Sequence, residues 1–339
     1  MSEPPILRDL ERQARNCEAM GSPFTARLLR ELARDLPAEG PLAERLRAWD
    51  GTPDDALPLR LAGALHALVL SGEAPALAAA YPPHPPDGLP GALRDALRRH
   101  EERMLAGLDG PPQTNEVGRS AVLIAAAGLL HARHPLPLRL SELGASAGLN
   151  LNFDCYALEA NGARLGPADA ALILRPRWTG PLPAPAPVRV EERRGVELRP
   201  IDAGDPAARL RLRSYVWADQ RERMERLDRA LALPPAPVDR GDVADWLPRR
   251  LAEAAPGRLH LVYHTVAWQY FPEPTQATCR AALEAAGARA TPEAPLAWLA
   301  VEGDGRSEGA VITLRLWPGG ERLDLGRADF HGAWVEWRG

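Results

Sequence analysis

The spacing of apolar residues changes at the Gly-Pro-Pro segment that begins at Gly110, and this change constrains the fold more than any other feature. Before it, apolar side chains recur at helical spacing, as in Leu28, Leu29 and Leu32, with no alternating run of β-branched residues. After it, short apolar runs typical of strands alternate with helical stretches, which indicates a mainly parallel sheet. The sequence therefore predicts a helical domain over residues 1–110 and an α/β domain over residues 111–339.

The α/β domain divides into expected strands and helices. Strands are expected over residues 136–143, 188–190, 196–201, 259–264, 296–301, 311–317 and 333–337. Helices are expected over residues 121–130, 206–231, 243–254 and 274–286. Since no helix separates the last two strands, we expect them to form an antiparallel hairpin that closes the sheet. The proline-rich residues 181–187 are expected to form an extended surface segment.

Charge and composition exclude several classes of function. The 41 basic residues against 45 acidic ones give a net charge of −4, whereas a nucleic-acid-binding domain is expected to carry a basic patch. Every basic side chain is arginine, which excludes a phosphate-loop lysine and a pyridoxal Schiff base. The start of the chain does not resemble a signal peptide, and the apolar residues 121–130 are far short of the roughly 20 that a membrane span needs. We therefore expect a cytoplasmic protein that binds neither nucleic acid nor membranes.

The most informative segment is Glu142-Leu143-Gly144-Ala145-Ser146-Ala147-Gly148-Leu149-Asn150, which completes an expected strand. An acid at a strand end, a turn of small residues and then a helix are the features with which a Rossmann-like sheet binds an adenosine cofactor. Asp202 follows the expected strand 196–201, in a suitable place to hold ribose hydroxyls. Asp242 lies in a turn before an expected helix. The alternative for the glycine turn is a tight strand-to-helix connection that binds nothing.

In this order, the motifs resemble those of the class I S-adenosylmethionine-dependent methyltransferase fold. Glu142-x-Gly144-x-x-x-Gly148 is similar to the first motif of that fold, Asp202 to the second, Gly241-Asp242 to the third and the end of residues 259–264 to the fourth. The resemblance covers the chain from about residue 115 and implies a small-molecule methyltransferase that uses S-adenosylmethionine. The implied cofactor-binding residues are Glu142, Gly144, Ser146, Gly148, Asp202 and Asp242, with Asp202 on the ribose and Asp242 on the adenine amine.

Two departures from that fold leave an alternative open. Ser146 replaces the usual middle glycine of the first motif, and the fourth motif has no Asp-Pro-Pro-Tyr signature. A protein that binds adenosine without transferring a methyl group is therefore an alternative. More narrowly, residues 112–120, 143–152 and 213–217 are similar to a bacterial family catalogued only as a domain of unknown function. That resemblance covers nearly the whole chain and implies no activity.

His264, at the end of an expected strand, is the candidate general base, because imidazole titrates near working pH and a strand end is exposed to the crevice. The alternative is a structural, hydrogen-bonded histidine. His260 would share a strand face with His264, and His131 would share a helix face with His134. Neither pair has a third ligand nearby in the sequence, so we expect no metal site.

Other residues are candidates for contact with the substrate. They are Asn115, Glu116, Arg119, Tyr215 and Trp268. The planar guanidinium of Arg119 is suited to a substrate carboxylate, but an interdomain network with Glu116 or a helix cap is the alternative. Tyr215 and Trp268 are expected either to frame an aromatic substrate or to fill the core.

Residues 144–148 also match the Gly-x-Ser-x-Gly nucleophile elbow of α/β-hydrolases. In that interpretation Ser146 is the nucleophile, Asp304 or Asp324 the acid and His331 the base. Two observations oppose it. The elbow of that fold follows several strands, whereas the first third of this chain is expected to be helical. A carboxylate at Glu142 would also oppose the developing oxyanion.

Overall fold

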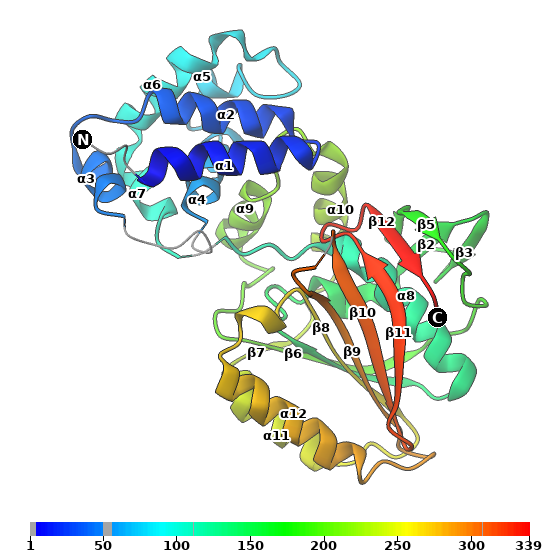
Figure 1. Ribbon diagram of the computed structural model, residues 1–339. Helices are drawn as coiled ribbons and strands as arrows, with labels where there is room; N and C mark the ends of the chain where they lie inside the picture. Colours follow the sequence, from blue (N-terminus) through cyan, green and yellow to red (C-terminus); the bar gives the residue numbers. More distant parts are fainter. Residues whose placement is uncertain (1–4, 50–55, 111, 307) are drawn as a thin grey trace. The chain divides into compact units, whose positions relative to one another are not determined.

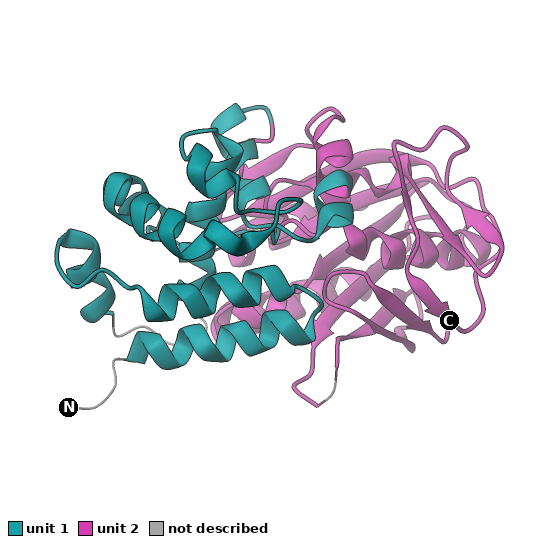
Figure 2. Ribbon diagram, turned by 90° about the horizontal axis from the view of Figure 1, so that it is seen from above, with its two compact units in different colours: residues 1–114, 204–225 teal, residues 115–203, 226–339 magenta. Residues whose placement is uncertain are grey.

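The computed structural model describes residues 5–49, 56–110, 112–306 and 308–339 (Figure 1). Contacts divide the chain into two compact units (Figure 2). The first contains residues 1–114 and 204–225, and the second contains residues 115–203 and 226–339. The first unit is therefore built from two separate stretches of the chain.

The first unit is helical, as the spacing of its apolar residues predicts. Its helices are α1 (Pro5–Ala19), α2 (Pro23–Arg34), α3 (Pro41–Arg47), α4 (Leu57–Leu70), α5 (Pro75–Ala78), the 3₁₀ helix η2 (Pro86–Gly88), α6 (Leu89–Arg99), α7 (Glu101–Gly107) and α9 (Pro206–Ser214). Apolar residues of α1, α2, α4 and α6 form one buried cluster. Burial of each leucine in that cluster contributes about 1.5–3 kcal/mol to folding.

Residues 204–225 are an integral part of the helical unit. The ring of Tyr215 lies so close to Gly63 of α4 that a Cβ there would be 2.8 Å from the ring. The Asp219 carboxylate accepts a hydrogen bond of 2.8 Å from the backbone N–H of Phe24 at the start of α2. The single helix expected over residues 206–231 is wrong, because α9 and α10 (Arg221–Leu231) are separated by the turn that carries these two contacts.

The second unit contains a nine-stranded sheet in the order β5-β12-β11-β10-β9-β8-β1-β6-β7. The strands are β1 (Leu138–Leu143), β5 (Arg177–Thr179), β6 (Val190–Glu197), β7 (Val238–Arg240), β8 (Leu259–Thr265), β9 (Leu296–Gly303), β10 (Ala310–Trp317), β11 (Glu321–Ala328) and β12 (Trp334–Trp337). Strands β7, β6, β1, β8 and β9 are parallel to one another, whereas β10, β11 and β12 pair antiparallel along the chain. The predicted α/β class, with a mostly parallel sheet and antiparallel carboxyl-terminal strands, is confirmed.

The order of the parallel strands locates the point at which this sheet can bind a ligand. Taken in chain order, β1, β6, β7, β8 and β9 lie in the sheet as third, second, first, fourth and fifth. This is the order of a doubly wound sheet. The chain adds strands from β1 toward β7 on one side, and then returns to add β8 and β9 on the other side of β1, so the order reverses between β1 and β8. Such sheets bind ligands outside the carboxyl ends of the strands, at the point of reversal. In this protein, that point lies between β1 and β8.

Helices cover both faces of the parallel part of the sheet (Figure 1). The remaining elements are η3 (Val117–Arg119), α8 (Ser120–Arg133), η4 (Leu149–Cys155), α11 (Val243–Ala252), η5 (Trp268–Tyr270), α12 (Glu273–Gly287) and a second sheet of β2 (Tyr156–Ala160), β3 (Ala163–Leu165) and β4 (Leu172–Leu174). Leu143 and Val262 pack with α11 and α12 on one face, while α8 contacts η4 and β2. Among the described residues, no helix combines the length and the apolar character that a bilayer span requires.

Two strand predictions are wrong. The hairpin expected between residues 311–317 and 333–337 does not form, because β11 lies between those segments and pairs with both β10 and β12. The strands expected over 188–190 and 196–201 are one strand, β6, which ends at Glu197. Pro200 has no N–H to donate to a sheet, so the ladder cannot continue through it.

Candidate functional site

The turn after β1 is held in left-handed backbone conformations. Gly144 and Gly148 both have φ of +72°, and Ser146 has φ of +54°. Glycine adopts such angles freely, whereas another residue loses about 1–2 kcal/mol. A Cβ at Gly144 would be 2.6 Å from Ala267, and one at Gly148 would be 2.8 Å from Val238. Contacts within the protein therefore account for both glycines, but not for the strained serine between them.

A second strained residue lies at the end of β8. Val266 has φ of +53°, which is unusual for a β-branched residue. Its backbone N–H donates a hydrogen bond of 2.8 Å to Val301 of β9, so this geometry is fixed by the sheet. Ser146 and Val266 follow the two strands between which the sheet order reverses. Backbone strain of this kind concentrates at functional sites, and it marks the ends of β1 and β8 as the candidate site.

The N–H groups of the glycine turn are largely used within the protein. Those of Gly144 and Ala145 donate to the carbonyl of Val196 at 3.0 and 3.1 Å, and that of Ser146 donates to Glu197 Oε2 at 3.2 Å. The α-helix expected after the turn is wrong, because η4 is a short 3₁₀ helix interrupted by non-helical angles at Asn152. The turn therefore lacks the free N–H groups and the helix dipole that bind a phosphate.

Glu142, two residues before Gly144 in β1, is buried, with 2% of its surface exposed. The hydroxyl of Tyr263 lies 3.5 Å from Glu142 Oε2 and donates to the backbone carbonyl of Asn150 at 3.2 Å. Burial raises the pKa of Glu142 to about 8, although Tyr263 and the positive charge of Arg119 oppose the rise. The side chain of Glu142 is therefore mostly neutral at pH 7.

The acid of β6 that contacts the glycine turn is Glu197. Glu197 is the last residue of β6 and is half-buried. Its Oε2 accepts a hydrogen bond from the Ser146 N–H, and its Oε1 accepts one from the Arg199 N–H at 3.3 Å. Asp202 is exposed in the loop beyond the end of the strand. The strand end expected at residue 201 is wrong, and Pro200 could have corrected it. A contact between Asp202 and ribose hydroxyls stays a prediction.

Asp242 follows β7, the neighbour of β6, and begins α11. Its Oδ1 accepts a hydrogen bond of 2.8 Å from the backbone N–H of Ala244, which makes it the N-cap of that helix. The side chain is exposed. A contact between Asp242 and an adenine amine stays a prediction, and any test of it has to preserve the cap.

His264 has hydrogen-bond partners at both ring nitrogens. The indole N–H of Trp298 donates to Nε2 at 3.0 Å, so Nδ1 carries the hydrogen that Glu302 Oε1 accepts at 2.7 Å. Glu302 Oε1 also accepts from the N–H groups of Ala267 and Trp268. Burial would raise the pKa of Glu302, but these bonds, that from His264 first, lower it. This geometry favours the structural alternative for His264 over a general base.

Asn115 and Arg119 hold the loops around the site. Asn115 Oδ1 accepts from the Leu149 N–H at 2.8 Å, directly after the glycine turn. Arg119 donates from Nη1 to the carbonyl of Thr265 at 2.8 Å and from Nε to that of Phe330 at 2.9 Å. Asn115 thus holds the segment after β1, and Arg119 connects the end of β8 to the segment before β12.

Glu116 and Asn150 extend this network. Glu116 Oε1 accepts from the Gly118 N–H at 3.0 Å, and its carbonyl accepts from the Asn150 amide at 3.3 Å. The Ser120 hydroxyl donates to Asn150 Oδ1 at 2.7 Å. Asn150 is the last residue of the segment 142–150. Its bonds to residues 116 and 120 could not be inferred from the spacing of residues in the sequence.

The two aromatic candidates lie in different units. Tyr215 belongs to the first unit, where it packs on Gly63. Trp268 belongs to the second unit and stacks on His264 with ring centroids 4.7 Å apart. The guanidinium of Arg280 lies 5.3 Å from the Trp268 ring. Trp268 therefore follows β8 at the candidate site, with one face used by His264.

The hydrolase interpretation lacks its central contact. Ser146 Oγ is buried and has no hydrogen-bond partner in the described part of the chain, whereas an activated serine needs a base within about 3 Å. Asp304 pairs with Arg327 at 2.9 Å and Asp324 with Arg338 at 2.8 Å. Within the described ranges, no group of at least three His, Cys, Asp or Glu side chains is placed to hold a metal ion.

The strand order, the strained ends of β1 and β8, and the acids at the ends of β1 and β6 together define a Rossmann-like α/β protein. The chain belongs to a family described as an uncharacterized protein conserved in bacteria, domain of unknown function 2332, whose family model matches residues 8–337. No curated protein matches the chain significantly.

Proposed function

We propose that this protein is an S-adenosylmethionine-dependent methyltransferase of a small molecule, with the cofactor at the carboxyl ends of β1 and β6. One observation carries the proposal. Glu142 and Glu197 lie at the ends of the adjacent parallel strands β1 and β6, and both border the strained turn of residues 144–148. That turn follows β1, one of the two strands between which the sheet order reverses. Doubly wound sheets bind nucleoside cofactors at this place.

The residues present fit the adenosine part of this cofactor. Glu197 is half-buried and accepts one hydrogen bond at each oxygen, so each oxygen keeps a lone pair for a ribose hydroxyl. Ser146 Oγ is buried and unpartnered, and it is able to donate one hydrogen bond and accept others. Asp242 would contact the adenine amine from the end of β7.

The same residues do not fit a dinucleotide. A pyrophosphate needs free backbone N–H groups at a helix N-terminus, whereas those of Gly144, Ala145 and Ser146 are bonded within the protein. S-adenosylmethionine carries no phosphate, and when bound it supplies an electrophilic methyl group. Glu142 would lie near its amino-acid end, where an ammonium group would favour the carboxylate form.

Methyl transfer depends mainly on in-line positioning of the acceptor, so it does not require His264 to act as a base. A protein that binds adenosine without transferring a methyl group is the second candidate. The two bonded nitrogens of His264 favour it, because neither nitrogen is free to take a proton from an acceptor. A radioactive methyl donor with a broad panel of small acceptors distinguishes the two, since a methylated product eliminates the second candidate.

The cofactor proposal is tested by calorimetric titration with S-adenosylhomocysteine, with NAD as the control ligand. We expect the first to bind and NAD not to bind. Glu197→Gln should weaken binding about 10-fold, since a hydrogen bond to a charged group contributes about 1.5–3 kcal/mol. Glu191→Gln is the matched control, because Glu191 is exposed on the same strand and pairs with Arg189. Absence of S-adenosylhomocysteine binding, or equal affinity in Glu197→Gln, would contradict the proposal.

A further inference from the structure

Three arginine side chains surround a single carboxylate at the amino ends of the parallel strands. Arg139 lies near the start of β1, Glu192 in β6, Arg250 near the end of α11 and Arg258 directly before β8. Arg139 Nε lies 3.1 Å from Glu192 Oε2, and Arg258 Nη1 donates to the same oxygen at 3.3 Å. Arg250 Nη1 donates to Glu192 Oε1. The three guanidinium groups therefore converge on one side chain.

Positive charge exceeds negative charge in this cluster. Among the described residues, Glu192 supplies the one carboxylate within 4 Å of the three guanidinium groups. Their other acceptors carry no net charge, and these are the Ser141 hydroxyl and the backbone carbonyls of Leu140 and Glu253. Two positive charges are therefore left without a counterion.

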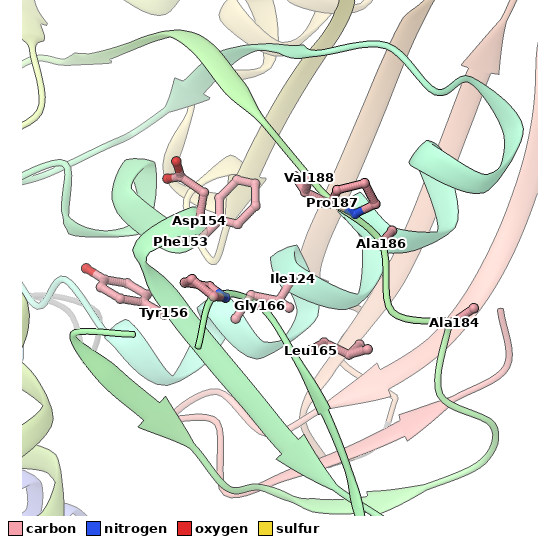
Figure 3. A pocket seen from close by; sticks show the side chains of 13 residues that line it. Ile124, Phe153, Asp154, Tyr156, Leu165, Gly166, Ala184, Ala186, Pro187 and Val188 are labelled. Carbon is pink, nitrogen blue, oxygen red and sulfur yellow. The ribbon is translucent and has the colours of Figure 1, made fainter. Parts of the chain in front are cut away.

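Two other arginines of β6 show the contrast, because each has a carboxylate of its own. Arg193 donates to both oxygens of Asp154 at 2.8 Å, and Arg194 donates to both oxygens of Asp239 at 2.7 and 2.8 Å. Figure 3 shows the Asp154 carboxylate turned away from the other residues that line a cavity of about 170 Å³ beside α8. Since a buried charge is costly unless it is paired, the shared carboxylate of Glu192 is the exception that needs an explanation.

The excess charge acts on the buried groups of the cluster. Burial and the charges of the three arginines lower the pKa of His260 well below its ordinary value, so its imidazole is neutral. The Ser141 hydroxyl lies 2.8 Å from His260 Nε2 and accepts from Arg250 Nε at 3.1 Å. Burial and the charge of Arg139 also lower the pKa of Arg250, against its bond to Glu192. A bound anion would offset this positive potential.

The cluster is open to solvent on the side of Arg258. The side chains of Arg139 and Arg250 are 11% and 10% exposed, whereas those of Arg258 and Glu192 are 35% and 34% exposed. In the described part of the chain, Arg258 donates one hydrogen bond, to Glu192, and its guanidinium has further N–H donors. Arg258 therefore offers donors at the surface, with two nearly buried guanidinium groups close to it.

We propose that this cluster binds a divalent oxyanion, inorganic phosphate or the phosphate group of a small molecule, beside Glu192. Guanidinium groups bind phosphate oxygens through paired N–H donors, and a phosphate group carries a charge of about −1.5 to −2 at pH 7, which matches the excess. Its oxygens accept hydrogen bonds from Arg258, while Arg139 and Arg250 stabilise its charge. The site lies at the opposite ends of the strands from the candidate cofactor site, so the proposal does not depend on methyltransferase activity.

Inorganic phosphate is the probe, and acetate, which carries a single charge, is the control ligand. Glycerol 3-phosphate, compared with inorganic phosphate, distinguishes an ester from the free anion by which of the two binds more tightly. Binding is measured by calorimetry at low ionic strength, because salt screens exposed charges. Arg258→Gln removes the exposed donor, and Arg249→Gln is the matched control, because Arg249 is exposed on α11. We expect phosphate to bind the wild type and Arg249→Gln with similar affinity, and Arg258→Gln about tenfold more weakly.

Glu192→Gln distinguishes a binding site from a purely structural ion-pair cluster. Removal of the competing carboxylate should strengthen phosphate binding about threefold, although the variant loses an ion-pair partner. Thermal unfolding establishes that each variant is folded before binding is compared, and Arg258→Gln carries the test if Glu192→Gln does not fold. The proposal is overturned if phosphate does not bind the wild type, if Arg258→Gln binds it as tightly as the wild type, if folded Glu192→Gln does not bind it more tightly, or if acetate binds as tightly as phosphate.

Discussion

Replacement of Glu142 by glutamine should remove much of the pH dependence of stability of the second unit. Burial raises the pKa of Glu142 from 4.5 to about 8, so the folded protein holds a proton that the unfolded chain releases. The resulting stabilisation is complete below pH 4.5, the unfolded pKa. It declines as the pH rises and is lost as the pH passes through 8.

The size of this effect follows from the two pKa values. Each tenfold change in proton affinity corresponds to 1.36 kcal/mol, so the rise from 4.5 to about 8 removes about 5 kcal/mol between low and high pH. At pH 7, the loss is about 3 kcal/mol. Glutamine has nearly the same shape and stays neutral, so Glu142→Gln should be about 1–3 kcal/mol more stable than the wild type at pH 7, after allowance for a less favourable hydrogen bond.

The assay is urea unfolding of the wild type and of Glu142→Gln at pH 5, 7 and 8.5. Hydrogen exchange of β1 and β8 amides reports on the second unit separately. Glu191→Gln is the control, because that side chain is exposed and its substitution should leave the slope against pH unchanged. Parallel pH profiles for the wild type and Glu142→Gln would show that Glu142 does not hold a proton in the folded protein.

Substitutions at Val266, Asp242 and Gly118 test the local geometry, and Gly91→Ala serves as a control. Val266→Gly should raise the free energy of unfolding by up to about 1 kcal/mol by relieving the left-handed backbone, and a loss of stability would refute the strain. Asp242→Ala should cost about 1 kcal/mol through the cap of α11, whereas Asp242→Asn should retain the cap and isolate any effect on S-adenosylhomocysteine affinity. Gly118→Ala should cost more than 2 kcal/mol in urea unfolding, because its Cβ would be 2.4 Å from the carbonyl oxygen of His331. Gly91→Ala, which meets nothing within 4 Å, should instead be neutral or stabilising.

The fold class could be predicted because the alternation of strands and helices is a local property of the sequence. β11 was missed because Glu321, Arg322 and Asp324 interrupt its apolar residues, and Gly326 weakens the strand signal. The inclusion of residues 204–225 in the helical unit depends on contacts of Tyr215 and Asp219 with distant helices. No local pattern encodes such contacts.

The candidate site was predicted in part. The turn of residues 144–148 and Glu142 could be located from spacing, and Glu197 could have been located from Pro200. The partners of His264 could not be located from the sequence. Glu302 and Trp298 lie on β9, and they contact His264 only because the strand register pairs His264 with Ala300. The strain at Ser146 and Val266 is a property of the folded backbone alone.

That strain bears on whether the turn after β1 is a bare connection or a binding site. A bare connection explains Gly144 and Gly148, since each backbone is left-handed and a Cβ would meet Ala267 or Val238. It does not explain Ser146 and Val266, because glycine at either position would adopt the same angles without losing about 1–2 kcal/mol. Both residues follow the strands between which the sheet order reverses, where a ligand can use a side chain that glycine lacks. The buried, unpartnered hydroxyl of Ser146 is such a side chain, and it favours a ligand site over a bare turn.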